Sequence, residues 1–396
     1  MISIDKIFNN SAEKLLHSFF GKVQYGQLDV IFPSGKKKEF LGNEQGIKAN
    51  IQLNNFLLLK KLFNKGSLGF AESYMDGDFS TSNLAGLLYF AHKNEQVYIH
   101  SKGGKFIYKF INRLFHYLNN NSKSKSKENI SYHYDLGNNF YSLWLDESMT
   151  YSSGFFELPY DDLFEAQSNK FKKITEPMLL NDNSSLLEIG CGWGSFATYV
   201  AKNFGSKVNA ITISKKQFDF TTKKIFQEGL NEKVTIQLKD YRDINEKYDY
   251  ISSIEMFEAV GQKYWSTYFS KIKNSLKNDG LAALQIITIN EKRREYYQQN
   301  PDFIQKYIFP GGILASKNQL YQVTSSLGIS FKELNSFGNS YANTLDLWNK
   351  KFQNKWLHIA KQGFSIKFKR MWEYYLAYCE VGFKTKSTDV SHFLLK

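Results

Sequence analysis

The chain has 396 residues, 42% of them hydrophobic, so it can bury a core and falls outside the composition of disordered proteins. Its net charge of +13 predicts an anionic partner, nucleic acid or a negatively charged membrane surface, although nucleotide bias in the coding genome also enriches Lys, Asn, Phe and Tyr. Two cysteines exclude a disulfide framework, and seven histidines without ligand spacing argue against a metal site. With no signal-peptide layout and no apolar run near the ~18 residues of a membrane span, we expect a cytoplasmic protein.

The N-terminal part of the chain mixes helical and strand-like patterns. Residues 1–20 place apolar side chains at helical spacing, whereas residues 47–53 alternate as in a half-buried strand. In chain order we predict a helix at 1–20, a strand at 28–32, a turn at 33–35, a strand at 47–53, a helix at 56–63, turns over 66–78 and helices over 84–118. These elements predict a small α+β domain.

A polar, low-complexity stretch follows at residues 119–130. Residues 119–128 repeat Ser, Lys and Asn without apolar anchors, which is typical of a linker. We therefore place the domain boundary there, between an N-terminal domain at 1–118 and a catalytic domain at 131–396.

Strands and helices alternate regularly in the second domain. After a helical lead-in at 131–141 and a loop at 149–154, we predict strands near 186–190, 207–213, 233–239, 248–254 and 281–289, with helices between them that include 215–228 and 264–276. An insertion at 291–328, a strand at 329–334 and helices at 343–361 and 364–380 complete the list. Such alternation predicts an α/β fold with a mostly parallel sheet covered on both faces.

A glycine-rich turn follows the first strand of this domain, in the pattern Glu188-x-Gly190-x-Gly192-x-Gly194. The third glycine of a dinucleotide fingerprint is replaced by Ser195, and no phosphate-binding lysine follows. The pattern instead resembles the first motif of class I S-adenosylmethionine methyltransferases, and a tight turn without a ligand is the alternative. In that resemblance Glu188 meets the methionine ammonium, and the glycines let the ligand lie against the backbone.

Further candidates lie where other parallel strands end, because ligands bind at the carboxyl edge of such sheets. Asp240 could accept a hydrogen bond from an adenine amino group, or it could be a helix N-cap. Glu255 and Glu258 could polarise each other as neighbouring carboxylates, or they could form a solvated helix start.

Ordered strings across residues 20–383 make the chain similar to the cyclopropane fatty acyl phospholipid synthase family. They are residues 66–69 and 72–77, 133–138, the glycine turn, 212–214 with Gln217, 240–243, 256–258 with 260–261, and 306–310. The resemblance implies a Rossmann-like, mostly parallel seven-stranded sheet, whose seventh strand would follow the insertion. It also implies an S-adenosylmethionine-dependent enzyme that adds a methylene to the cis double bond of an unsaturated phospholipid acyl chain.

The resemblance also implies the site residues. Cofactor contacts are expected from Tyr151, Ser152, Glu188, Gly190, Cys191, Gly192, Gly194, Thr212, Gln217, Asp240, Tyr241 and Arg242. In the family a bound bicarbonate removes the proton that allows the ring to close, and the matching positions are Glu258, the Ile287 amide, Tyr341, Ser153 and Gln285. The last two depart from the family, which has Cys and His there. Cys379 matches a family cysteine sometimes assigned to the active site, and we expect it to be a buried structural thiol.

These departures keep an alternative open, a fatty-acid C-methyltransferase that leaves a methyl or methylene branch and works with a flavin reductase. A catalytically inactive lipid-binding protein is the third hypothesis. We expect a location at the inner membrane surface, on anionic phospholipid, with the N-terminal domain serving for docking or homodimerisation. No Asn-Pro-Pro-Tyr type string is present, so we expect no nucleic-acid substrate.

Overall fold

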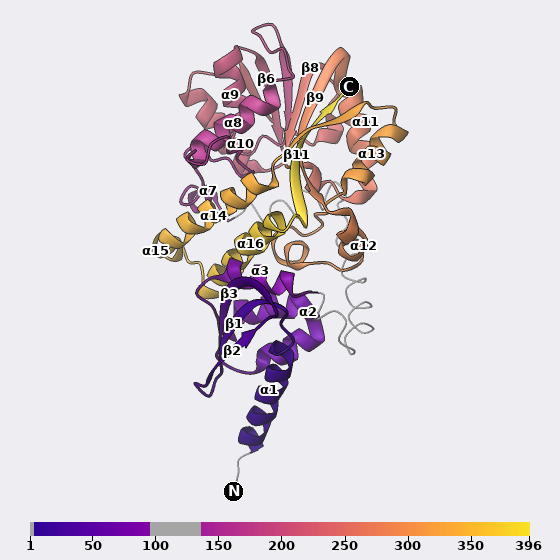
Figure 1. Cartoon of the computed structure of the whole chain (residues 1–396). Coiled ribbons are helices and arrows are strands. Elements are labelled where there is room, and N and C mark those ends of the chain that lie inside the picture. Colours follow the sequence, from indigo (N-terminus) through magenta and orange to yellow (C-terminus); the bar gives the residue numbers. More distant parts are fainter. Residues whose placement is uncertain (1–3, 96–135) are drawn as a thin grey trace. The chain divides into compact units, whose positions relative to one another are not determined.

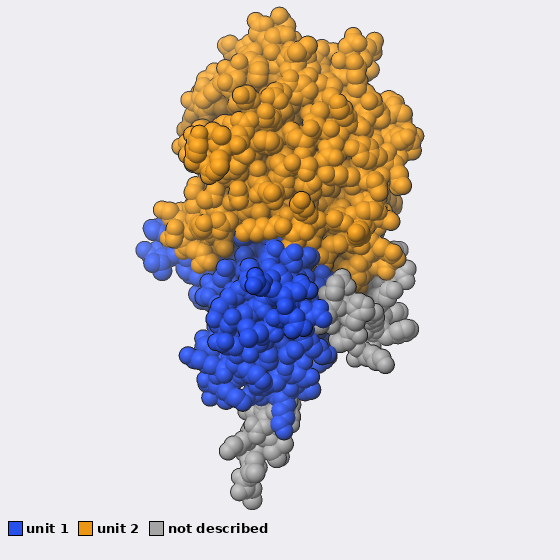
Figure 2. Space-filling model, in the orientation of Figure 1, with its two compact units in different colours: residues 1–114, 356–381 blue, residues 115–355, 382–396 orange. Residues whose placement is uncertain are grey.

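The computed structural model describes residues 4–95 and 136–396 (Figure 1). These residues fall into two compact units (Figure 2): unit 1 comprises residues 1–114 and 356–381, and unit 2 comprises residues 115–355 and 382–396. The predicted linker at 119–130 lies outside the described residues. The predicted catalytic domain at 131–396 differs from unit 2 in residues 356–381, which pack with the N-terminal unit.

Unit 1 is a four-stranded sheet with helices. The sheet order is β2-β1-β3-β4, with β1 parallel to β3 and antiparallel to β2. The elements are α1 (Ile4–Phe20), β1 (Tyr25–Ile31), β2 (Lys37–Leu41), β3 (Glu44–Leu53), α2 (Leu57–Asp76), β4 (Phe79–Ser80) and α3 (Leu84–Lys93). The predicted α+β composition of this region is therefore present, with β2 and β4 as strands that the sequence pattern did not indicate.

Helix α2 corrects the prediction of turns over 66–78. It continues to Asp76 through a kink at Gly66, whose φ of 55° and ψ of −133° are non-helical. A Cβ on Gly69 would lie 2.0 Å from the Lys61 carbonyl oxygen, so this glycine lets the two halves of the kinked helix approach closely. The glycines thus serve a bent helix rather than a loop.

Two C-terminal helices belong to unit 1, α15 (Trp356–Ala360) and most of α16 (Ile366–Lys384). The Tyr74 hydroxyl donates a hydrogen bond to Glu373 across 2.9 Å, and the Arg370 guanidinium donates to the carbonyl oxygens of Tyr74 and Phe79. Buried polar contacts between segments almost 300 residues apart explain why α16 packs with α2, which local periodicity cannot predict.

Unit 2 is built on a seven-stranded sheet with the order β10-β11-β9-β8-β5-β6-β7. Six of the strands run in the same direction, and β11 alone is antiparallel, to both of its neighbours β9 and β10. The strands are β5 (Ser185–Ile189), β6 (Lys207–Thr212), β7 (Val234–Leu238), β8 (Tyr248–Ile254), β9 (Leu276–Ile289), β10 (Phe331–Ser336) and β11 (Thr388–Leu395). The predicted mostly parallel α/β sheet is confirmed, and its seventh strand is β11.

Helices cover both faces of this sheet (Figure 1). The helices of unit 2 are α7 (Asn138–Tyr141), α8 (Leu163–Thr175), α9 (Ser195–Phe204), α10 (Lys215–Gln227), α11 (Trp265–Ser275), α12 (Glu291–Gln299), α13 (Lys317–Ser326) and α14 (Gly338–Asn354). Its short helical turns are η1 (Tyr241–Asp243), η2 (Phe257–Ala259), η3 (Gln262–Tyr264) and η4 (Ile304–Ile308). Along β5, Leu186 packs with α8 and α9, whereas Leu187 packs with α11. This alternation creates two apolar layers, one on each side of the sheet.

No helix in the described part of the chain is long and apolar enough to cross a membrane.

Candidate active site

The glycine turn connects β5 to α9 at the carboxyl edge of the sheet. Gly190, Gly192 and Gly194 have φ values of 87°, 52° and 79°, a region that favours glycine. A Cβ on Gly194 would lie 2.4 Å from Thr221 Cγ2, whereas a Cβ on Gly192 would meet nothing within 4 Å. The turn is therefore packed against α10 at Gly194 and open at Gly192, where a ligand could lie against the backbone.

Glu188 lies next to this turn and is almost fully buried. Its carboxylate accepts a hydrogen bond from the Ala197 backbone N–H, and burial raises its pKa to about 8. Among the described residues, its Oε2 atom has no hydrogen-bond partner. A buried carboxylate oxygen beside an open glycine turn fits the positively charged amino group of S-adenosylmethionine.

The ends of β6 and β7 hold the other predicted cofactor contacts. Thr212 Oγ1 donates to Gln217 Oε1 across 2.8 Å at the start of α10. Asp240 caps η1 and forms two hydrogen bonds with the Arg242 guanidinium, of 2.8 and 2.7 Å. The N-cap role considered for Asp240 is therefore present, and its contact with adenine stays a prediction. Burial raises the pKa of the neighbouring Tyr241 to about 12.

Tyr151 and Ser152 lie in a loop between aromatic and polar neighbours. The Tyr151 ring centroid lies 5.3–5.6 Å from the ring centroids of Tyr141, Trp144 and Trp348. Ser152 Oγ accepts a hydrogen bond of 2.7 Å from the ammonium of Lys170 on α8. The rings of Tyr141, Trp144 and Trp348 pack around Tyr151 and hold the loop in place.

Lys170 is a site residue that the sequence analysis missed. It is fully buried, and burial lowers its pKa to about 7 against the opposing effect of the carboxylates of Glu255, Asp146 and Glu188. The signal was present, because Gln167 and Lys170 lie at helical spacing on the same face of α8 as its apolar residues. Polar residues on a core-facing stripe require partners, which here come from the site.

Glu255 is the centre of the carboxylate cluster that follows β8. Its Oε1 atom accepts hydrogen bonds from the Ser153 backbone N–H (2.9 Å) and from Gln285 Nε2 (2.7 Å), and its Oε2 atom accepts one from the Tyr341 hydroxyl (2.6 Å). Burial raises the pKa of this carboxyl, while Tyr341, Ser153, Lys170 and Gln285 oppose that effect. The structure therefore brings three of the predicted catalytic residues together around a fourth side chain that was not predicted to be catalytic.

Glu258 and Ile287 form a second pair beside this cluster. The Ile287 backbone N–H donates to Glu258 Oε1 across 2.6 Å, and Glu258 Oε2 is a buried atom without a hydrogen-bond partner among the described residues. Burial, and then the nearby charge of Glu255, raise the pKa of Glu258 to about 8. Glu255 therefore raises the pKa of Glu258, as expected for neighbouring carboxylates, and the two residues do not form a solvated helix start.

The serine and the two cysteines among the predicted residues have different surroundings. Ser153 directs its hydroxyl to the Gly154 carbonyl oxygen (2.8 Å), so only its backbone reaches Glu255. Cys379 lies on α16 in unit 1, and it is partly exposed rather than buried as expected. Cys191 is buried, its pKa is raised by burial, and it lies in the glycine turn.

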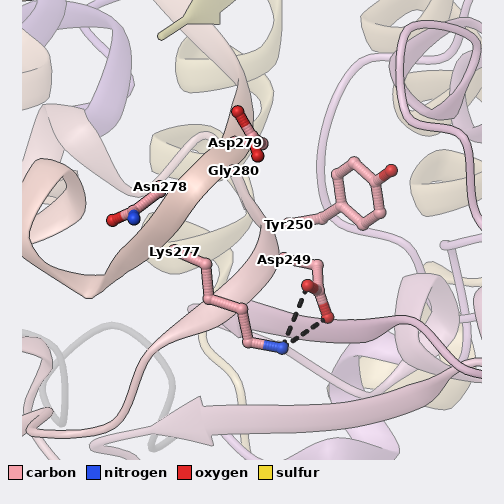
Figure 3. A pocket seen from close by; sticks show the side chains of 6 residues that line it. All are labelled: Asp249, Tyr250, Lys277, Asn278, Asp279 and Gly280. Atoms are coloured by element: carbon pink, nitrogen blue, oxygen red, sulfur yellow. Dashed lines mark hydrogen bonds and ion pairs between the residues drawn. The ribbon is translucent and has the colours of Figure 1, made fainter.

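A surface depression elsewhere in unit 2 is lined by Asp249, Tyr250, Lys277, Asn278, Asp279 and Gly280 (Figure 3). It lies at the amino end of β8, the opposite edge of the sheet from the glycine turn. The Lys277 ammonium bonds both oxygens of Asp249, at 3.0 and 2.9 Å. This depression is not part of the candidate active site.

Comparisons with known proteins show the family of the chain. Residues 121–393 match the family model described as mycolic acid cyclopropane synthetase. The chain is 38% identical to the cyclopropane-fatty-acyl-phospholipid synthase of Escherichia coli over 86% of each chain. It is 32% identical to the tuberculostearic acid methyltransferase of Mycobacterium tuberculosis, covering 85% of this chain and 81% of the relative.

A solved structure gives the same result for the fold. The mycolic acid cyclopropane synthase CmaA1, complexed with SAH and CTAB, superposes with a TM-score of 0.64 and 28% identity, over 68% of this chain and 97% of that one. The sheet, the glycine turn and this likeness define a class I S-adenosylmethionine-dependent methyltransferase. Within that class, the chain belongs to the mycolic acid cyclopropane synthetase family.

Proposed function

We propose that this enzyme transfers a one-carbon unit to the cis double bond of an unsaturated phospholipid acyl chain and produces a cyclopropane fatty acid. The observation that carries the proposal is the pair of partly buried carboxylates, Glu255 and Glu258, that follows β8 at the same sheet edge as the glycine turn. An alkene that accepts a methyl group must afterwards lose a proton, so the reaction requires a base at this position. The relatives named for cyclopropane synthesis support the same reaction.

Different residues of the chain would bind the cofactor and accept the proton. S-adenosylmethionine supplies an electrophilic methyl group when it is bound. Glu188 would hold the ligand's amino group, and the open backbone at Gly192 would give it room. The other predicted contacts, at Tyr151, Ser152, Thr212, Gln217 and Asp240–Arg242, would position the rest of the ligand.

The lipid substrate implies docking on a membrane. A net charge of +13 favours attraction to anionic phospholipid at the cytoplasmic surface, since such surfaces attract Lys and Arg. Glu255 and Glu258 both belong to unit 2. We propose that unit 1 serves membrane docking or a homodimer contact.

One observation favours a second candidate function. Gln285 stands where the family has His, so the residue beside the base cannot titrate. Altered proton removal changes the product, and the relative named as a tuberculostearic acid methyltransferase has comparable similarity. The second candidate is therefore a C-methyltransferase that leaves a methylene or methyl branch, with a flavin reductase as its partner.

Mass spectrometry of fatty acids separates these functions. The chain would be expressed in a host without its own cyclopropane synthase. A gain of one CH₂ with loss of the double bond and ring-type fragments supports the cyclopropane. The same gain with the double bond retained or moved supports the branched product. No gain in any lipid, with the cofactor still bound, contradicts both.

A further inference from the structure

We propose that the carboxylate of Glu255 is itself the base of the reaction and takes the place of a bound bicarbonate. Three of the groups that the family resemblance assigns to bicarbonate, at Ser153, Gln285 and Tyr341, all donate to Glu255, with distances of 2.6–2.9 Å. The donors are thus already satisfied by an anion that belongs to the chain. This inference rests on the proposed one-carbon transfer and deepens it.

The same geometry leaves no favourable place for a second anion. Each of the three donors has one hydrogen directed at Glu255, and the fourth expected ligand, the Ile287 N–H, donates to Glu258. A bicarbonate in this cluster would compete with the Glu255 carboxylate for the same donors at close range, and two anions in a partly buried site repel strongly. The residues present therefore do not fit bicarbonate.

The backbone of Glu255 supplies a second, independent observation. Its φ is 51°, in the left-handed region, where a glutamate costs free energy that glycine does not. Glu255 also donates its backbone N–H to the Gln285 carbonyl oxygen at 2.9 Å, which holds the strained residue in place. Such strain persists where the surrounding structure fixes the residue, and here it directs the side chain to the three donors.

The charges around Glu255 suit a base. Burial raises the pKa of the Glu255 carboxyl, whereas its hydrogen bonds with Tyr341, Ser153 and Gln285 and the buried ammonium of Lys170 oppose that effect. A carboxylate placed among these donors can accept the proton that the new methyl group loses. Tyr341 is held in turn by stacking on Phe383, with ring centroids 4.4 Å apart.

The step assigned to Glu255 balances without another reactant. After methylation the lipid has a positive charge on one carbon of the former double bond and a new methyl on the other. A C–H bond of that methyl breaks, its electron pair forms the C–C bond to the cationic carbon, and the proton passes to a Glu255 carboxylate oxygen. The products are a neutral cyclopropane and a protonated Glu255, which returns its proton to solvent before the next turnover.

The test uses Glu255→Gly, because glycine accepts the φ of 51° without strain and opens a space among the three donors. Conversion of unsaturated phospholipid vesicles is measured in buffers depleted of dissolved carbon dioxide, and then with added bicarbonate or formate. We expect the wild-type rate to be unchanged by depletion, the variant to lose about 100-fold or more, and bicarbonate to restore its rate about tenfold. Glu232→Gln, an exposed glutamate before β7, is the matched control and should behave as wild type.

Two further measurements keep the outcomes separate. S-adenosylhomocysteine binding by calorimetry should be equal in wild type and Glu255→Gly, which shows that the variant is folded. Labelled ¹³C-bicarbonate should bind the variant and not the wild type in NMR spectra. A wild-type rate that falls on depletion and recovers with bicarbonate overturns the role of Glu255, as does a Glu255→Gly variant with an undiminished rate. Absence of any wild-type conversion contradicts the proposed function itself.

Discussion

His392 Nε2 lies 3.0 Å from Gln285 Oε1, and both side chains are fully buried. Burial lowers the pKa of His392 to about 3, so the ring is neutral and carries one N–H. Because an amide oxygen only accepts, that N–H is on Nε2, and it fixes which end of the Gln285 amide faces Glu255. His392 on β11 thus orients Gln285 on β9 toward Glu255.

We predict that His392→Leu lowers kcat about tenfold with a smaller change in KM, because the Gln285 amide loses the partner that holds its NH₂ group toward Glu255. Lipid conversion measured over a range of substrate concentrations separates the two parameters. His392→Gln keeps a donor and should recover most of the rate, which a role in packing alone would not explain. An unchanged kcat in His392→Leu contradicts the orienting role.

We predict that Gly192→Val abolishes S-adenosylmethionine binding, because the new side chain projects into the open side of the turn. Isothermal titration calorimetry with S-adenosylhomocysteine measures the loss. Gly229→Val is the matched control, since Gly229 has a φ of 67° and equally open space around its Cβ, but lies in the turn after α10. Both variants carry the same kind of backbone strain, and only Gly192→Val should lose the ligand. Wild-type affinity in a folded Gly192→Val protein would remove the turn from the binding site.

We predict that Glu188→Gln stabilises the ligand-free enzyme at neutral pH while it weakens cofactor binding. The folded-state pKa of Glu188 is about 8, above its ordinary value, so the folded protein holds a proton that the unfolded chain releases as the pH rises from about 4.5 to 8. The free energy of unfolding therefore falls across that window. Glutamine at position 188 does not titrate, so this fall is absent from the variant. Its free energy of unfolding at pH 7 should exceed that of wild type by up to roughly 3 kcal/mol.

Urea unfolding at pH 5, 6, 7 and 8 checks this prediction, with Glu232→Gln as the exposed control. Equal pH slopes in wild type and Glu188→Gln would show that the Glu188 carboxyl is not the group responsible. Cofactor binding measured on the same samples should weaken in Glu188→Gln alone.

We predict that binding to anionic vesicles weakens as salt is added, because the charge of +13 acts through a screened attraction. Co-sedimentation with phosphatidylglycerol vesicles at increasing sodium chloride measures the effect. Phosphatidylcholine vesicles, which carry no net charge, are the control and should bind weakly at every salt concentration. Binding that does not change with salt contradicts electrostatic docking.

Local sequence patterns predicted the parallel sheet and the glycine turn, because alternating β and α periodicities and a Glu-x-Gly-x-Gly-x-Gly turn are determined by neighbouring residues. They did not predict the surroundings of Glu255, because its three donors come from residues 153, 285 and 341. The same holds for the kinked helix α2, where glycines read as turns serve the close approach of two helical halves. Contacts between distant segments decided the surroundings of Glu255, and close packing within one kinked helix decided those of Gly69.

The position of β11 has a consequence for how the protein is made. This strand comes last among the seven in chain order, yet it lies inside the sheet between β9 and β10, and it carries His392. A ribosome must therefore release residues 388–395 before β10 can join the sheet and before Gln285 is oriented. Until then the nascent chain can assemble the glycine turn but not the complete proton-accepting site, so cofactor binding should precede activity during synthesis.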